Sequence, residues 1–366
     1  MKNNNLFQFA TSELSQDAIV CWCLNWIHYP DSKLYPLAVD LFKLLGQENV
    51  NLNQRITIKK QVKKIDILVL FHDSNKILII EDKTFSSEHD DQIQKYKNTI
   101  KEDRSIDFEV DNNPIIQTVF FKTGYFFDDD KLMRFNNKAD IIVDGQMFFD
   151  VISKNMYKGV SEILDDYVSY LNSVLDDNKR NEKISGKNSD GGYYVSRNHI
   201  TQYRLMRSIF PEDRWEKNTD VFRVKPGSNI GGRPWTETSI IKDQCFYGTK
   251  DLYGLFWRID SDTYGPYLSL RFYEWFNKKD NLKLVRHEEA YKKLLNLAKE
   301  IVETENFCFS WNKIEEGFRG RYKESSLLRI GLNSYLDNWQ ESSQTFIDSV
   351  RRLNDRFIEK LKTLKI

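Results

Sequence analysis

The chain has 366 residues, of which 40% are hydrophobic, 30% are charged and four are cysteines. This length exceeds what a single core usually supports, and the cysteines are too few for a disulfide framework. The net charge of zero divides unevenly, because residues 1–180 carry 22 basic and 28 acidic side chains, whereas residues 181–366 carry 32 and 26. An acidic half joined to a basic half suits a metal-holding centre beside a polyanion-binding surface, although this imbalance is modest.

Neither a secretory signal pattern nor a stretch of about 18 apolar residues is present, so we expect a cytoplasmic protein with no membrane partner. The first half alternates between helical and strand-like periodicity. Helices are predicted within residues 12–30, 35–46, 86–103 and 156–175, and strands within residues 55–60, 63–71, 76–85, 115–121 and 139–144. This order predicts an α/β (α+β) domain with helices flanking a buried sheet.

Residues 176–192 contain almost no apolar side chains and are typical of a linker or a long exposed loop. We therefore predict a first domain at 1–178, a linker at 179–192 and a C-terminal domain at 193–366. The C-terminal domain mixes strand-like and turn-like segments up to residue 276. Helical patterns follow at 290–302 and 343–364, which predicts a second mixed α+β domain.

The two strands around "HDSN" (72–75) carry acids inside or directly after apolar runs. If the turn is centred between Asp73 and Ser74, residues whose numbers sum to 147 face each other, and Asp66 then faces Glu81. Like charges opposite each other in a buried sheet are destabilising. Either a bound divalent cation or a raised pKa on one acid would account for this pair.

Strand alternation places Glu81 and Lys83 on one face and Asp82 on the other. Asp66, Glu81 and Lys83 are therefore expected to converge, with Asp82 structural or facing solvent. Two carboxylates that hold a cation, with an ammonium beside them, can activate a water molecule next to a phosphodiester and stabilise the charge that develops.

Asp66 followed by Glu81-x-Lys83, with each motif in an apolar strand, resembles the PD-(D/E)XK nuclease superfamily. The upstream helix "ELSQDAIVCWCLNW" (13–26) resembles that of one branch, in which a glutamate adds a metal ligand, and Glu13 is its counterpart. The segment "QIQKY" resembles the same branch's Q-x-x-x-Y motif, with Gln92 and Tyr96 supporting the site. The residue before Asp66 is Ile65 rather than proline, so the "PD" is not literal.

The resemblance covers about residues 7–175. It implies a restriction-endonuclease-like mixed sheet flanked by helices, dependence on Mg²⁺ or Mn²⁺, and cleavage of nucleic acid, with DNA favoured over RNA. By analogy it suggests a role in prokaryotic defence against phage or other mobile DNA. It specifies no target, and it leaves a homodimer open.

Several residues have ordinary alternatives. Gln92 and Tyr96 are one helical turn apart and could simply pack together, and Glu13 could simply favour a helix N-terminus. In the second half we expect an ordinary turn at 227–235 and a core strand around Arg271. Phosphate contacts are assigned to a basic stretch, which could equally be a solvated face; its residues are Arg319, Arg321 and Lys323.

The leading functional hypothesis is a metal-dependent nuclease that uses Asp66, Glu81 and Lys83. One alternative is a nuclease-fold binding module without catalysis. Another is an effector whose C-terminal half senses a partner or a ligand.

Overall fold

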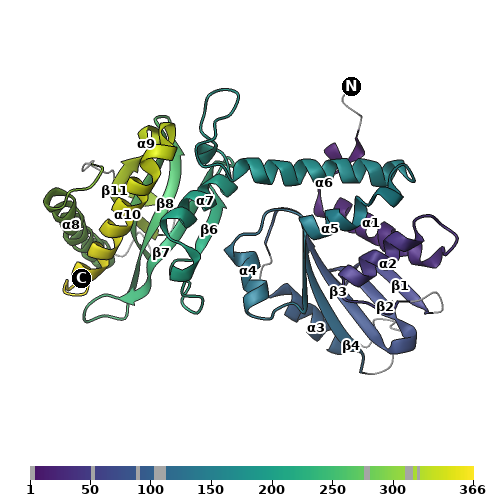
Figure 1. Cartoon of the computed structure of the whole chain (residues 1–366). Coiled ribbons are helices and arrows are strands. Elements are labelled where there is room, and N and C mark those ends of the chain that lie inside the picture. Colours follow the sequence, from purple (N-terminus) through teal and green to yellow (C-terminus); the bar gives the residue numbers. More distant parts are fainter. Residues whose placement is uncertain are drawn as a thin grey trace. The chain divides into compact units, whose positions relative to one another are not determined.

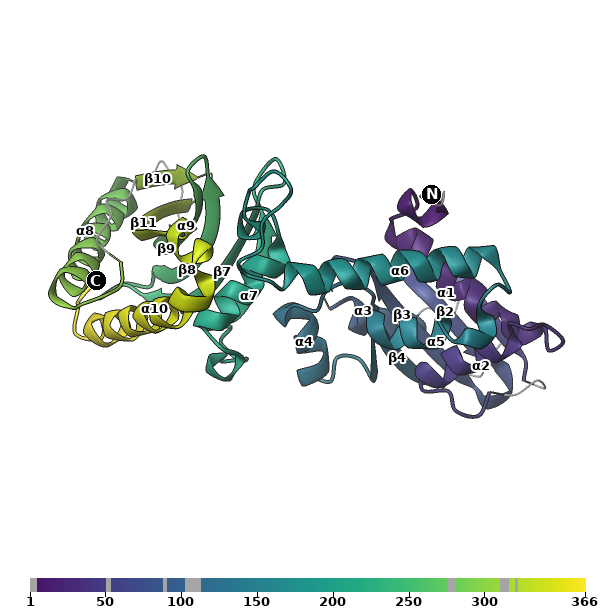
Figure 2. The same cartoon turned by 45° about the horizontal axis from the view of Figure 1, so that its top comes forward.

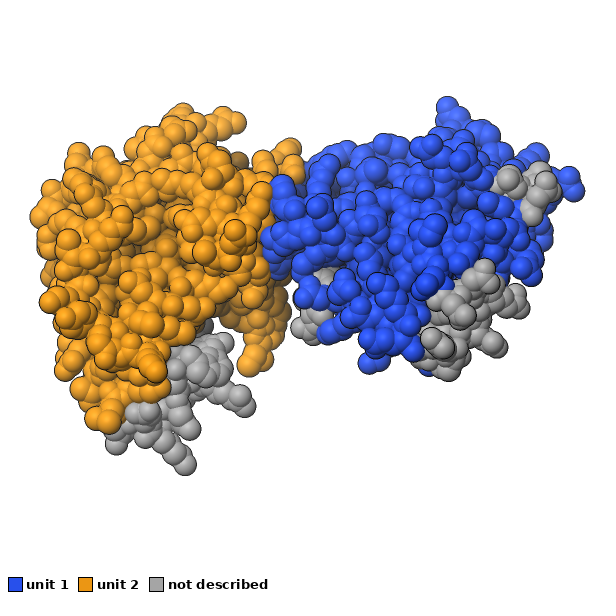
Figure 3. All heavy atoms as spheres, turned by 90° about the horizontal axis from the view of Figure 1, so that it is seen from below, with its two compact units in different colours: residues 1–179 blue, residues 180–366 orange. Residues whose placement is uncertain are grey.

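The computed structural model describes residues 5–50, 54–87, 91–102, 113–275, 281–309, 316–319 and 322–366. The chain forms two compact units, residues 1–179 and 180–366 (Figure 3). Each unit has its own sheet, and each is described by itself below.

The N-terminal unit is built on a five-stranded mixed sheet in the order β1-β2-β3-β4-β5 (Figure 1). The first three strands are antiparallel, whereas β3, β4 and β5 run parallel. Their bounds are β1 (Ile56–Val62), β2 (Ile65–Phe71), β3 (Lys76–Lys83), β4 (Ile115–Lys122) and β5 (Ile141–Asp144). The central strand β3 is buried almost along its whole length, as the apolar run at its start predicts.

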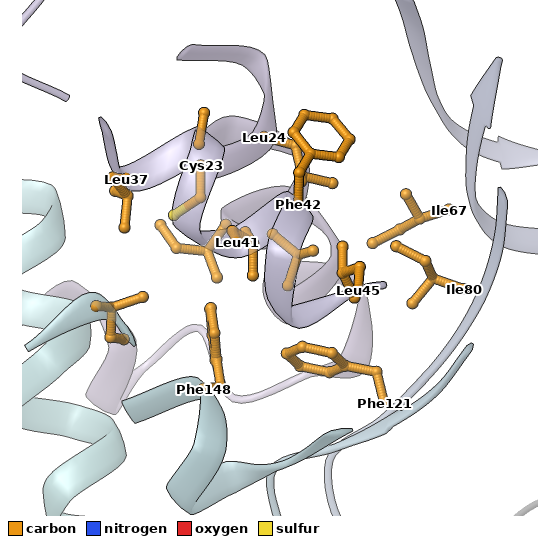
Figure 4. Packing of buried hydrophobic residues seen from close by; sticks show 14 of the residues in the cluster. Cys23, Leu24, Leu37, Leu41, Phe42, Leu45, Ile67, Ile80, Phe121 and Phe148 are labelled. Atoms are coloured by element: carbon orange, nitrogen blue, oxygen red, sulfur yellow. The ribbon is translucent and has the colours of Figure 1, made fainter. Parts of the chain in front are cut away.

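Helices cover both faces of this sheet. One face packs against α1 (Glu13–Asn25), α2 (Tyr35–Leu44), α5 (Gly145–Ile152) and α6 (Glu162–Asn181). Figure 4 shows part of this core, in which Leu41 and Phe42 of α2 lie over Ile67, Ile80 and Phe121 of the sheet. The other face packs against α3 (Gln92–Glu102), and Met133 of α4 (Asp128–Phe135) joins a smaller cluster there. The two faces therefore meet different helices, which decides what surrounds each side chain of β3.

The predicted mixed sheet flanked by helices is confirmed, and so is the hairpin register. Ile67 pairs with Ile80 and Leu68 with Ile79, so facing residues sum to 147. Two short helices, α4 and α5, were not predicted. The expectation that residues 176–192 form a loop is wrong for its first part, because α6 continues to Asn181. Polar side chains there extend a solvated helix, supported by the bond from Asn172 to Asp176.

The C-terminal unit contains an all-antiparallel six-stranded sheet in the order β10-β11-β9-β8-β7-β6 (Figure 2). Its strands are β6 (Val224–Ser228), β7 (Pro234–Cys245), β8 (Leu252–Asp262), β9 (Gly265–Trp275), β10 (Glu316–Arg319) and β11 (Tyr322–Gly331). Its helices are α7 (His199–Ile209), α8 (Asn281–Thr304), α9 (Asn333–Asp337) and α10 (Trp339–Leu361). The predicted mixed α+β character is confirmed, although α7 was not recognised in the sequence.

Helices α7, α8 and α10 lie against one face of this sheet. Gln202 of α7 accepts a hydrogen bond from Thr236, and Asn354 of α10 accepts one from the buried Trp257 indole. His287 of α8 contacts Ser325 of β11. No helix in the part of the chain that the structure describes is long and apolar enough to span a membrane.

Candidate active site

Asp66 lies at the start of β2, one position beyond the last pair of the β2–β3 ladder, Ile67–Ile80. Its Oδ2 accepts a hydrogen bond of 3.0 Å from the backbone nitrogen of Asp82. Its Oδ1 accepts a bond of 3.1 Å from the side-chain amide of Gln61. The carboxylate is thus held beside the end of β3 by one backbone and one side-chain donor.

Glu81 is fully buried, and Lys83 is 7% exposed. The Lys83 Nζ lies 2.6 Å from Glu81 Oε1 and 4.0 Å from Asp66 Oδ2. Burial, reinforced by the charge of Asp66, raises the pKa of Glu81 to about 7, although Lys83 acts in the opposite direction. Burial opposes the Lys83 charge, but Glu81 and Asp66 outweigh it and raise the pKa of Lys83. The structure therefore brings the three residues together, with the ammonium between the carboxylates.

Helix α3 covers this group with Tyr96, which is buried against the same face of the sheet. The Tyr96 hydroxyl interacts with Glu81, and Gln92 Nε2 lies 3.5 Å from that hydroxyl. Burial and the charge of Glu81 raise the pKa of Tyr96, so the hydroxyl keeps its proton. Tyr96 thus touches the acid directly, whereas Gln92 reaches it through Tyr96.

Asp82 points to the opposite face, as strand alternation predicts, but it does not face solvent. It is 1% exposed and accepts a hydrogen bond from Gln16 of α1. Burial, followed by the charge of Asp17, raises the pKa of Asp82 well above its usual range. Burial also raises the pKa of Asp17, so this face of β3 holds two neighbouring acids that both resist ionisation. Of the two alternatives expected for Asp82, its burial against α1 favours a structural acid over a solvent-facing one, because α1 covers this side of β3.

Gln16 fastens the ends of two strands to α1. Its Nε2 also donates to the Lys83 carbonyl at 3.0 Å, and its Oε1 accepts from the hydroxyls of Thr84 and Thr123. The backbone that carries Lys83 is therefore anchored to α1. Sequence reasoning missed this role, although Gln16 lies in the segment "ELSQD" on which the family resemblance partly rests.

Glu13 lies in the first turn of α1, where its Oε1 accepts a hydrogen bond from Ser86. Its charge reaches the site, because it favours the charged forms of both Lys83 and Lys122, although burial lowers the pKa of Lys122 overall. Among the described residues, however, no three His, Cys, Asp or Glu side chains converge closely enough to hold a metal ion. Glu13 is thus near the Asp66–Glu81 pair without forming a closed cluster with it.

Lys122 is a second lysine at the site that the sequence did not reveal. It ends β4 directly beside Lys83, and its Nζ lies 2.6 Å from Asp130 Oδ2 of α4, with both side chains fully buried. Burial lowers the pKa of Lys122 against the opposing effect of Asp130. The sequence pattern that could have revealed Lys122 is a lysine at the end of the apolar strand "IIQTVFFK", as at the end of β3.

The donor set at Asp66 and Glu81 fits a hard divalent cation. Both Glu81 carboxylate oxygens are buried, and neither accepts a hydrogen bond of regular geometry, although Lys83 and Tyr96 lie close to this carboxylate. Carboxylate oxygens are the ligands that Mg²⁺ and Mn²⁺ prefer. The ammonium of Lys83 already supplies positive charge at this position, which indicates that the local field favours a cation.

The mixed sheet, with two acids and a lysine at the ends of its central hairpin, defines a nuclease-like class of fold and site. The family model described as the PD-(D/E)XK nuclease superfamily matches residues 5–184, and the N-terminal unit belongs to this superfamily. Comparisons with the curated proteins and with the solved structures each found no match.

The predicted phosphate contacts in the second half cannot be placed at the site. Arg321 lies outside the described residues, and only the backbone of Arg319 and Lys323 is described, in β10 and β11. The expected turn at 227–235 is a hairpin between β6 and β7, and Arg271 is buried in β9 as expected.

Proposed function

We propose that this protein is a metal-dependent nuclease that hydrolyses phosphodiester bonds of nucleic acid, with DNA favoured over RNA. The single observation that carries the proposal is the convergence of Asp66, Glu81 and Lys83 at the end of the β2–β3 hairpin. Membership of a nuclease superfamily supports the reaction class. Action against phage or other foreign DNA would suit such an enzyme and is part of the proposal by analogy alone.

In this proposal Asp66 and Glu81 hold Mg²⁺ or Mn²⁺, with Glu13 as an additional ligand. The bound cation would lower the pKa of a water molecule and offset charge on the phosphate. Lys83 orients that water and stabilises the charge on the phosphate oxygens as water adds to phosphorus. The bond from phosphorus to the leaving oxygen breaks, and that oxygen takes up a proton. Tyr96 fixes the Glu81 carboxylate.

A second candidate is a nuclease-fold module that binds nucleic acid without cutting it. Intact acids and lysine argue against this candidate, because a binding role alone gives no reason to bury Glu81 beside Asp66 at an electrostatic cost.

The test is cleavage of plasmid, linear duplex, single-stranded DNA and RNA by the full chain, with Mg²⁺, Mn²⁺ or EDTA. We expect metal-dependent cleavage that Asp66→Asn abolishes and that Lys83→Met strongly reduces. Cleavage in EDTA, or by both variants at the wild-type rate, would overturn the proposed site. Binding without cleavage in every metal would favour the second candidate.

A further inference from the structure

A cavity of about 500 Å³ lies on the C-terminal sheet, in the unit that carries no residue of the proposed nuclease site. Most of its lining side chains come from the sheet face opposite the helices, and Asp220, Arg223 and Asn229 come from the segments on either side of β6. On β7, Thr236 points to the helices, whereas its neighbours Trp235 and Glu237 line the cavity. On β8, Trp257 points to α10, whereas Phe256 and Arg258 line the cavity. A volume of this size accommodates a ligand of roughly drug or nucleotide dimensions.

Aromatic rings form part of the cavity wall. Trp235, Phe256 and Tyr273 all line it, and the last two rings meet edge to face with centroids 5.6 Å apart. The guanidinium of Arg258 lies 4.4 Å from the centroid of the Trp235 ring. Ring faces and a stacked guanidinium are surfaces on which a planar heterocycle can stack.

The floor beneath these rings is charged. Arg271 pairs with Glu324, and Arg258 lies 3.4 Å from Asp260 and 3.9 Å from Glu324. Arg258 and Arg271 are 6% and 3% exposed. The Arg258 Nε is buried without a hydrogen-bond partner in the described residues. Arg258 also donates a hydrogen bond of 3.0 Å to Asn229, and buried charges paired in this way hold fixed positions.

Glu237 contributes an acid to the same wall. No hydrogen bond or ion pair within the described part of the chain involves its carboxylate, although the charges of Arg258 and Lys225 act on it. Burial raises the pKa of Glu237 against these cations. The half-buried Glu237 carboxylate faces the cavity, with Lys225 of β6 and Arg258 of β8 as its cross-strand neighbours. It is well suited to a ligand that offers N–H groups.

The rim is basic. Lys225 of β6 is exposed at the cavity and forms no ion pair with the described residues, whereas Arg223 and Lys242 both pair with Asp220. The ammonium of Lys225 at the edge can pair with an anion. The aromatic rings and the donor and acceptor groups beside it are complementary to a planar polar ring.

We propose that this cavity is a nucleotide-binding site. The base stacks among Trp235, Phe256 and Tyr273, and its hydrogen-bonding edge meets Glu237 and Arg258. The phosphate lies at Lys225. A carboxyl acceptor beside a guanidinium donor matches the mixed donor and acceptor edge of a base.

The nucleotide could be free or part of a single strand, since both present the same base and phosphate. The binding proposal stands apart from catalysis, because it concerns different residues and is tested without divalent metal.

The test is calorimetric titration of the full chain in EDTA with the four common nucleoside 5′-monophosphates, the matching nucleosides, and short single-stranded oligonucleotides. We expect saturable binding of at least one nucleotide, and weaker binding of its nucleoside. Glu237→Gln and Lys225→Ala should each weaken nucleotide binding by about tenfold, the loss of one charge-assisted contact. Lys250→Ala, which removes an exposed lysine from the β7–β8 hairpin outside the cavity, should bind as the wild type.

Melting temperatures show whether each variant is folded, and Lys225→Ala changes only an exposed side chain. Binding of oligonucleotides alone, with the same dependence on Glu237 and Lys225, would identify a strand as the source and support the site. Binding that neither substitution weakens, or no binding of any nucleotide or oligonucleotide, would overturn it. Loss of cleavage with nucleotide binding retained would separate this site from the nuclease proposal.

Discussion

The backbone nitrogen of Asp82 donates to the Asp66 carboxylate at 3.0 Å. Beyond the last pair of the β2–β3 ladder, a side-chain oxygen therefore replaces the backbone acceptor. Asp66 thus has two separable roles. Its oxygen accepts a hydrogen bond from β3, and its negative charge belongs to the proposed active site. The acceptor is a matter of fold stability, and the charge is a matter of the proposed chemistry.

We predict that Asp66→Asn keeps the stability of the wild type within about 1 kcal/mol while losing cleavage, because the amide oxygen still accepts the bond. Asp66→Ala should lose cleavage and about 1–3 kcal/mol of unfolding free energy, since the Asp82 amide then lacks this acceptor. Urea unfolding and initial cleavage rates measure the two effects. Equal unfolding free energies for the two variants would contradict the assignment.

Lys83→Met keeps the length of the side chain and removes the ammonium between the two acids. We predict a fall in the cleavage rate on the order of 100-fold, the usual effect of removing one charge-stabilising group. Lys43→Met, on the exposed face of α2, is the matched control and should cleave at the wild-type rate. If both variants cleave equally, Lys83 has no catalytic role.

Gln16→Ala removes the amide that joins Asp82, the Lys83 carbonyl and two threonines. We predict a loss of about 1–3 kcal/mol in unfolding free energy, since buried partners are left unsatisfied. The cleavage rate should also fall, because the backbone of Lys83 loses its anchor. Gln94→Ala, at an exposed position of α3, should change neither the denaturation midpoint nor the rate.

The buried Lys122–Asp130 pair permits a double-mutant test. Asp130→Asn should cost about 3–5 kcal/mol of stability, because the Lys122 charge is left buried without its partner. Lys122→Met combined with Asp130→Asn should cost clearly less than the sum of the single changes, since the double variant leaves no buried charge without its partner. Additive costs in chemical denaturation would show that the pair is not coupled.

The raised pKa of Glu237 predicts how the free energy of unfolding depends on pH. Its pKa is raised on folding by burial, with Glu324 acting in the same direction and Arg258, Lys225 and Arg271 in the opposite one. The folded protein therefore holds this proton more tightly than the unfolded chain. The resulting stability is present below the unfolded pKa and is lost as pH rises through the folded value. Glu237→Gln should flatten this decline in unfolding free energy between acidic and neutral pH, and an unchanged slope would contradict it.

The sequence predicted the hairpin part of the site well, because that part is local. A short turn and period-two alternation were enough to place Asp66 opposite Glu81 and to turn Asp82 away. Both rules concern neighbouring residues in one antiparallel pair.

Residues brought in by long connections could not be predicted. Lys122 reaches Lys83 only through the register of the parallel strands β3 and β4, which local sequence does not specify. Asp82 is buried because α1 packs over β3. Strand alternation predicts to which face of the sheet Asp82 points, but it does not predict which helix covers that face. The aromatic and charged face of the C-terminal sheet combines strands β6 to β9 and β11 through several separate hairpins.

The loop His72–Asn75 has a consequence beyond connecting two strands. The exposed residues of this loop can be substituted, but the length of the loop sets which residues of β2 and β3 face each other. If one residue were added to the loop and the β2–β3 pairing shifted by one position, Asp66 would point away from Glu81, because neighbouring residues of a strand point to opposite faces. Insertion and deletion in this loop are thus constrained by the chemistry at the far end of the hairpin, although the loop itself touches none of it.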